Sequence, residues 1–275
     1  MKFALIDGDR REPTPGSTGR CPGCGQEVVA KCGSLRLWHW AHKGRRNCDP
    51  WWEPETEWHR AWKNLFPQDW QEVPHRADEG ELHIADIRTP DGLVLEFQHS
   101  AIKPAERLSR ERFYKRMLWI VDGSRLKNDR PRIDREIQRW RTMEEMKFHV
   151  AIDPDSTFPQ RWLDALVPVL FDFDGLSRDE DFPEEHEGKP RSVLRNKEWW
   201  SIRGAKPDPL VCLVPNPGDI NSIYFIIRRE AFLDAAVNNP EILDASAIMQ
   251  RFTREQHRRL QAYMSIRRGR RTPRF

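Results

Sequence analysis

Two carboxylates in residues 82–100 (LHIADIRTPDGLVLEFQHS) have the spacing of a metal-binding hairpin. The segment predicts two short strands joined by the turn sequence TPDGL (89–93), in which Pro and Asp suit a type I turn and Gly92 suits the left-handed conformation that follows it. A three-residue loop makes the first and last of these five residues face each other, and counting back places Asp86 opposite Glu96. Their Cβ atoms would lie about 5 Å apart, which is unfavourable for like charges unless a cation lies between them.

The alternation of side chains along the two strands defines two faces. One face is apolar and is expected in the core: Ala85, Ile87, Leu93, Leu95 and Phe97. The other face carries Asp86, Glu96 and Gln98, whose oxygens suit a hard divalent cation. We therefore expect Asp86 and Glu96 to bind Mg²⁺ or Mn²⁺ and, with Gln98, to be catalytic. The alternatives are an edge hairpin with a solvated polar face, or a two-residue turn that would move Asp86 to the wrong face.

Four residues near the amino terminus have the spacing C-x2-C-x14-H-x2-H, which suits a closed tetrahedral zinc site: Cys21, Cys24, His39 and His42. The sequence between the two pairs predicts a small hairpin that carries the histidines to the cysteines. Cys32 and Cys48 are rival ligands, since either of them can replace one of the histidines. Nothing nearby resembles a thioredoxin-like unit, so we expect structural zinc rather than redox chemistry.

The segment 51–66 (WWEPETEWHRAWKNLF) predicts a helix with Pro54 in its first turn. Glu55, His59 and Lys63 repeat every four residues and share one face of this helix. Two interpretations of that face remain open. It is either a solvated, salt-bridged surface, or it brings Glu55 or His59 to the hairpin as a further metal ligand or acid–base group.

Further elements complete a recognisable order. Residues 70–75 predict a strand before the hairpin, residues 104–117 predict a helix that opens with Pro, and residues 118–122 predict an apolar strand. The order is therefore helix, three strands, helix, strand. Three residues of the second helix share a face that would either contact a phosphodiester or be solvated: Arg107, Arg110 and Tyr114.

The hairpin resembles the active site of the PD-(D/E)XK nuclease fold, in which an Asp ends one strand and E-x-K lies on the next; here Gln98 stands where lysine is usual. The motifs CPGCG…HWAH, ETEWHRAWK, ADI…LEFQHSAI and LWIVDG, within residues 21–123, resemble the CoiA-like competence protein family. That resemblance implies a zinc-finger-like module joined to a PD-(D/E)XK nuclease domain that processes DNA. It implies a nuclease centre at Asp86, Glu96 and Gln98, with Glu55 and His59 alongside.

The composition bounds the remaining chain. The 275 residues suffice for two modest domains, and we expect a zinc-binding module at 1–50, a nuclease core at 51–125 and an α+β extension at 126–275. The extension predicts strands at 167–173 and 223–227, helices at 132–146, 229–238 and 253–266, an exposed acidic loop at 177–190, and a basic tail at 267–274. No apolar run of 18 residues and no signal peptide is evident, so the expected location is the cytoplasm, without a membrane partner.

These observations predict an α/β protein with a restriction-endonuclease-like αβββαβ core and a mixed sheet. The expected function is cleavage of DNA phosphodiester bonds with Mg²⁺ or Mn²⁺, on single-stranded DNA or free ends, with a protein partner or a second copy left open. The net charge of only +3 does not by itself argue for nucleic acid. The alternatives are a non-catalytic, zinc-containing nucleic-acid adaptor on a degenerate nuclease fold, and an RNase.

Overall fold

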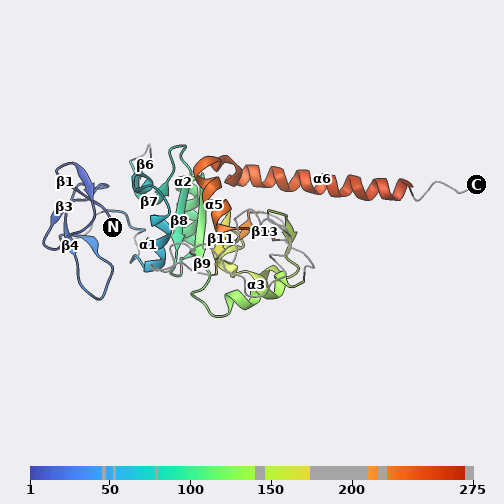
Figure 1. Ribbon diagram of the computed structural model, residues 1–275, viewed down its shortest axis with the longest axis horizontal. Helices are drawn as coiled ribbons and strands as arrows, with labels where there is room; N and C mark the ends of the chain where they lie inside the picture. The colour runs from blue at the N-terminus through green and yellow to red at the C-terminus, as the bar shows by residue number, and fades with distance from the viewer. Residues whose placement is uncertain are drawn as a thin grey trace, which may run out of the picture.

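The computed structural model describes residues 1–44, 48–51, 54–77, 80–139, 146–173, 210–215 and 222–269. They form an α/β protein with two sheets, a small amino-terminal one and a larger mixed one (Figure 1). The small sheet lies at one end of the molecule, and helix α6 (Ala245–Gly269) points away at the opposite end (Figure 1). Within the described residues, no helix is long and apolar enough to cross a membrane.

The amino-terminal module is an antiparallel sheet in the order β2-β1-β3-β4-β5. Its strands are β1 (Ala4–Ile6), β2 (Asp9–Arg11), β3 (Thr18–Arg20), β4 (Glu27–Lys31) and β5 (His39–His42). The predicted hairpin is confirmed as β4 and β5, in which Val28 pairs with His42. The apolar core of the module contains only a few buried residues, Ala4, Cys21, Val28 and Trp40. A core this small is typical of modules that a bound metal stabilises.

The larger sheet has the order β10-β13-β12-β11-β9-β8-β7-β6. Its strands are β6 (Gln71–Arg76), β7 (Leu82–Arg88), β8 (Val94–Gln98), β9 (Met117–Asp122), β10 (His149–Val150), β11 (Val169–Asp172), β12 (Leu210–Val214) and β13 (Ile223–Ile227). Strand β9 is parallel to β8 and β11, and the other pairs are antiparallel, so the sheet is mixed as expected. Strands from both sides of residue 125 pair in this one sheet, so the carboxy-terminal segment extends the sheet that β6 to β9 begin.

Helices cover both faces of the larger sheet. The helices are α1 (Glu57–Asn64), α2 (Pro104–Tyr114), α3 (Asp129–Ile137), α4 (Pro154–Thr157), α5 (Arg229–Asn238) and α6, with 3-10 turns at Gln68–Trp70, Gln160–Trp162 and Pro240–Leu243. Strand β9 is buried throughout because successive side chains enter two different cores. Leu118 packs in the core with α1 and α5, whereas Trp119 packs in the core with α2 and α3.

The predicted order helix, three strands, helix, strand is present as α1, β6, β7, β8, α2 and β9. One boundary differs from expectation, because α1 begins at Glu57 rather than around Pro54. Thr56 is the N-cap, and its side chain accepts a hydrogen bond from the backbone N–H of His59. A threonine cap satisfies a free N–H of the first turn, which Pro54 cannot do.

The hairpin register predicted from the three-residue loop is confirmed. Ile87 pairs with Leu95, and Arg88 pairs with Val94. Thr89 N–H donates to Leu93 O across the loop at 2.9 Å, and Gly92 has φ +89°, a conformation that favours glycine. The register that places Asp86 toward Glu96 therefore follows from the turn sequence.

Several expectations for the carboxy-terminal segment are confirmed as β11, β13 and α5. The charged helix expected at 132–146 is present as the shorter α3, and part of its predicted span lies outside the described residues. The acidic loop at 177–190 and most of the basic tail also lie outside them. The helix expected at 253–266 is the distal part of the longer α6, whose side chains from His257 to Ser265 are all exposed.

Candidate functional site

Three thiols and one imidazole converge in the amino-terminal module. The ligand atoms of Cys21, Cys24, His42 and Cys48 all lie within 4.8 Å of one another. The Sγ atoms of Cys21 and Cys48 are 3.8 Å apart, and His42 Nε2 is 3.3 Å from Cys24 Sγ. Two sulfurs of a tetrahedral zinc site, with Zn–S bonds of about 2.3 Å, lie about 3.8 Å apart. The donor set and its spacing fit zinc.

The expected ligand set is corrected at one position, because Cys48 rather than His39 completes this group. His39 and His42 lie on strand β5, where residues three apart point to opposite faces. H-x2-H brings two imidazoles to one ion on a helical turn but not on a strand. His39 Nδ1 instead donates to Leu37 O at 2.8 Å. Cys32, the other rival, is not among the converging residues.

The thiols of Cys21 and Cys48 have different pKa values. A hydrogen bond from the Cys48 thiol lowers the pKa of Cys21 to about 4, and backbone N–H groups of the knuckle assist. The same bond and burial raise the pKa of Cys48 above its ordinary value. One thiolate is therefore available near neutral pH to bind a soft cation.

Asp86 and Glu96 face each other where strands β7 and β8 separate. The ladder ends at the pair Ile87–Leu95, and beyond it each carboxylate accepts a backbone N–H from the opposite strand. Asp86 N–H donates to Glu96 Oε1 at 3.2 Å, and Phe97 N–H donates to Asp86 Oδ2 at 3.0 Å. The two side chains thus replace a pair of backbone hydrogen bonds between the strands, which holds the carboxylates close together and fixes their orientation.

The electrostatics of this pair indicate missing positive charge. Burial, and then the neighbouring Asp86 carboxylate, raise the pKa of Glu96 to about 8. Burial also raises the pKa of Asp86, although Lys63 and His59 oppose that effect. Two facing carboxylates with raised pKa values, one buried and one half-buried, favour the binding of a cation. Their oxygen donors fit Mg²⁺ or Mn²⁺.

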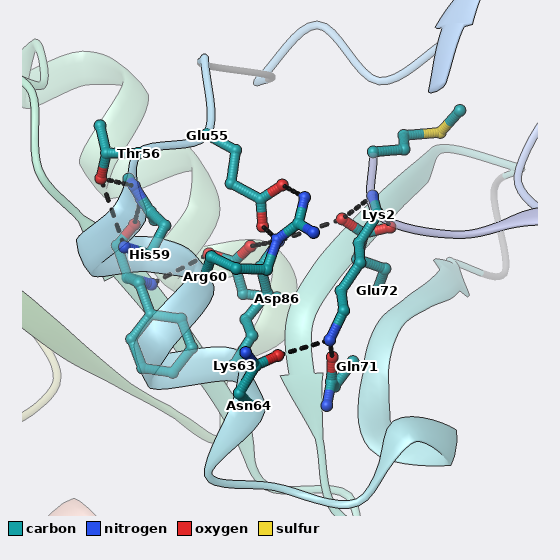
Figure 2. A network of polar contacts seen from close by, with 12 residues as sticks. Lys2, Glu55, Thr56, His59, Arg60, Lys63, Asn64, Gln71, Glu72 and Asp86 are labelled. Atoms are coloured by element: carbon teal, nitrogen blue, oxygen red, sulfur yellow. Dashed lines mark hydrogen bonds and ion pairs between the residues drawn. The ribbon is translucent and has the colours of Figure 1, made fainter. Parts of the chain in front are cut away.

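Lys63 is the cation nearest to Asp86 in a buried network that Figure 2 shows. Its Nζ lies 2.7 Å from Glu55 Oε1, 3.0 Å from Glu72 Oε1 and 3.7 Å from Asp86 Oδ1. Burial lowers the pKa of Lys63, but these three carboxylates outweigh burial and raise it above its ordinary value. The ammonium is therefore permanently charged.

Glu55 and His59 both line the same cleft as Asp86, but they are already engaged. Glu55 pairs with Arg60 through both carboxylate oxygens and with Lys63, which lower its pKa despite its burial. His59 Nε2 donates to Phe97 O at 2.7 Å, and its Nδ1 is 3.1 Å from Thr56 Oγ1. Of the two interpretations of this helix face, the salt-bridged surface is confirmed in its ion pairs but not in its solvation, because Glu55 and Lys63 pair with each other while nearly buried. Both residues lie at the site and hold its elements in place.

Gln98 occupies the expected strand position but turns away from the cleft. It is only 2% exposed, and its Nε2 donates to Ser100 O at 3.1 Å. Among the described residues that line the cleft, Gln98 is absent. The E-x-Q motif therefore places its carboxylate in the cleft and leaves its amide beside Ser100.

The three residues expected to contact substrate on α2 have other surroundings. Arg107 is buried and pairs with Glu111 and Asp164, so it is a structural residue. Arg110 Nη1 donates to Glu96 Oε2 at 3.0 Å, so it orients the Glu96 carboxylate. Tyr114 is buried at the edge of the cleft, and burial followed by the charge of Glu96 raises its pKa well above the ordinary value.

The cleft has a volume of about 300 Å³ and is bounded by both parts of the molecule. The amino-terminal module contributes Trp40, His42 and Cys48 to its lining. The core contributes Glu55, Lys63, Asp86, Glu96 and Arg110. A ligand held by Asp86 and Glu96 therefore also meets the module that carries the cysteines.

Residues 48–51 connect the converging cysteines to the carboxylate pair. Asp49, which follows Cys48 of the converging group, accepts the backbone N–H of Ile84 on β7 at 2.8 Å and bonds His83 Nδ1 at 2.8 Å. Trp51 O accepts a hydrogen bond from Arg110, whose guanidinium also holds Glu96. We call residues 48–51 the connecting segment. It links the cysteine cluster to both strands of the hairpin.

Sequence reasoning did not assign Lys63, Glu72 or Asp49 to the site. The four-residue spacing of Glu55, His59 and Lys63 did place Lys63 on the correct face. Glu72 gave no signal, because its carboxylate reaches the site only through a positive φ of 47° at the start of β6. Asp49 follows a cysteine that was weighed only as a rival ligand.

A sequence model described as the N-terminal domain of competence protein CoiA matches residues 17–50. This span contains all four converging residues, so the resemblance to CoiA-like proteins is confirmed for the amino-terminal module. No curated protein matches the chain. No solved structure matches it.

Proposed function

We propose that this protein is a nuclease of the PD-(D/E)XK type that cleaves DNA phosphodiester bonds with Mg²⁺ or Mn²⁺. The observation that carries the proposal is the facing pair of half-buried Asp86 and buried Glu96 at the opening of the β7–β8 hairpin, within a cleft. The order α1, β6, β7, β8, α2, β9 supports the fold assignment. The match of residues 17–50 to the CoiA module supports a role in DNA processing related to competence.

Each residue of the pair has a defined task in this proposal. Asp86 and Glu96 would hold the cation, with Phe97 N–H orienting the first and Arg110 orienting the second. A bound Mg²⁺ or Mn²⁺ supplies an acidified water and neutralises charge that develops on the phosphate. Hydrolysis adds water across one bridging P–O bond and yields a phosphate monoester and a hydroxyl end. The cysteine group would hold structural zinc, which stabilises the module by about 10 kcal/mol or more.

A second candidate is a nucleic-acid adaptor without catalysis. The orientation of Gln98 toward Ser100 favours it, because the E-x-K lysine is missing from the cleft. The two candidates differ in one observable, since an adaptor binds nucleic acid but consumes none.

The test is digestion of circular and linear, single- and double-stranded DNA, and of RNA, with Mg²⁺, Mn²⁺ or no added divalent ion. We expect the wild type to cut DNA only with an ion, and Asp86→Asn and Glu96→Gln each to reduce cutting to background while remaining folded. Asp91→Asn is a matched control, because Asp91 lies in the turn of the same hairpin and pairs with Arg116 instead. A wild type that cuts nothing, and whose melting temperature responds to neither ion, would reject the nuclease.

A further inference from the structure

Lys63 has a hydrogen-bonding capacity that its protein partners do not use. An ammonium group carries three donors. Two face Glu55 and Glu72 at 2.7 and 3.0 Å, whereas Asp86 Oδ1 lies 3.7 Å away, which is beyond hydrogen-bond distance. Among the described residues, no other acceptor contacts Nζ. One N–H therefore remains for a partner on the Asp86 side of the cleft (Figure 2).

The two carboxylates beside Lys63 have further partners of their own. Glu72 already accepts the backbone N–H groups of Lys2 and Phe3 at 2.7 to 3.1 Å. Glu55 already pairs with both donor nitrogens of Arg60. These further partners fix the two carboxylates, which therefore hold the Lys63 ammonium in one position. A buried cation that is fixed in this way and points toward a carboxylate pair is preorganised for an anionic ligand.

We propose that Lys63 donates this hydrogen bond to a non-bridging oxygen of the scissile phosphate. It thereby supplies, from helix α1, the positive charge that the Gln98 position of β8 lacks. The inference rests on the proposed function. It makes Lys63 a catalytic residue and assigns Glu55 and Glu72 as the positioning residues that aim it.

The test compares Lys63→Met with Lys2→Met. Lys2 is a matched control because it is also a buried lysine of this network, yet its Nζ bonds Asn64 and Gln71 and does not approach Asp86 (Figure 2). Single-turnover cleavage of DNA and the rise in melting temperature with Mn²⁺ are measured for both. We expect Lys63→Met to cut about 100-fold more slowly or worse, Lys2→Met to stay within a few-fold of wild type, and both to retain stabilisation by Mn²⁺.

Lys63→Met that cuts as fast as Lys2→Met overturns the inference and leaves the nuclease standing. A wild type that neither cuts nor responds to an ion overturns both. If Lys63→Met does not fold, Glu55→Gln/Lys63→Met replaces it, since removal of both charges of a buried pair costs less than removal of one. Cleavage by that double variant at the rate of Glu55→Gln alone would likewise overturn the inference.

Discussion

At the scale of single residues, the acidity of Glu96 gives the metal-free protein an unusual dependence on pH. Its folded pKa of about 8 lies above the ordinary 4.5, so the folded state binds the proton more tightly than the unfolded chain. Stability is then highest at low pH within this range and falls as pH rises from about 4.5 through about 8. The depressed pKa values of Glu55 and Glu72 act in the opposite direction, but below pH 4.5.

We therefore predict that the wild type with zinc bound, but without Mg²⁺ or Mn²⁺, loses a few kcal/mol of unfolding free energy between pH 5 and pH 8.5. Zinc must be present, because in the zinc-free protein the lowered pKa of Cys21 changes stability in the opposite direction over the same pH range. Glu96→Gln should flatten most of that slope and should be the more stable protein at pH 8.5. Saturating Mn²⁺ should remove the Glu96 slope of the wild type, since the ion displaces the proton and Glu96 is then ionised in both the folded and the unfolded states. Denaturant melts at several pH values measure this. A wild type whose stability does not change over that range contradicts the raised pKa.

The two histidines of β5 should behave differently although only two residues separate them. His42→Ala should lower the zinc content of the purified protein and leave the module open to protease, because Nε2 of His42 faces Cys24 Sγ. His39→Ala should retain one zinc per chain, because its ring lies on the other face and bonds Leu37 O. The zinc content of both variants tests this prediction. Loss of zinc from His39→Ala would contradict it and would support the ligand set expected from spacing, in which His39 rather than Cys48 is a ligand.

At the scale of elements, the connecting segment is the most informative place to perturb. Asp49 bonds the backbone N–H groups of Ile84 and Trp51 and the ring of His83, which hold its pKa low against the effect of burial. Asp49→Asn keeps the shape but removes the charge. We predict a loss of about 2 kcal/mol of unfolding free energy, unchanged zinc content and slower DNA cleavage, because Trp51 and therefore Arg110 lose their fixed position.

The same variant separates two explanations of the segment. Zinc content, melting temperature and single-turnover cleavage are measured together. Slower cleavage with full zinc shows that the segment acts on the carboxylate pair. Unchanged stability would show that the three hydrogen bonds of Asp49 do not hold the hairpin.

At the scale of the whole molecule, the sequence predicted local geometry well and long-range geometry poorly. The turn TPDGL determined the register of β7 and β8, and the motif order predicted α1 to β9. Lys63 could not be assigned, because its role depends on Glu72 and Asp86, which lie on two other strands. Cys48 was ambiguous for the same reason, since its approach to Cys21 and Cys24 depends on how distant segments pack, whereas the spacing of the histidines decides between them only once β5 is known to be a strand.

The sequence also did not predict one of the strands in the carboxy-terminal half of the larger sheet. Strand β12 gave no recognised pattern, although it pairs with both β11 and β13 in the middle of the carboxy-terminal half. An all-buried strand has no alternation to recognise, because both of its faces are apolar.

The cleft with walls from both parts of the molecule affects how metal dependence can be measured. Under the proposed function, a strong chelator would remove the catalytic ion and, given time, the zinc that would stabilise the module. In an assay stopped at a single time point, the loss of the catalytic ion and the loss of zinc would both appear only as absent cleavage. Excess Mg²⁺ would refill only the carboxylate pair. Activity would then return after brief or weak chelation, and would stay lost after prolonged exposure unless zinc were also restored. The rate at which activity recovers, rather than the inhibition itself, would therefore show whether the ion at the carboxylate pair or the zinc of the amino-terminal module had been lost.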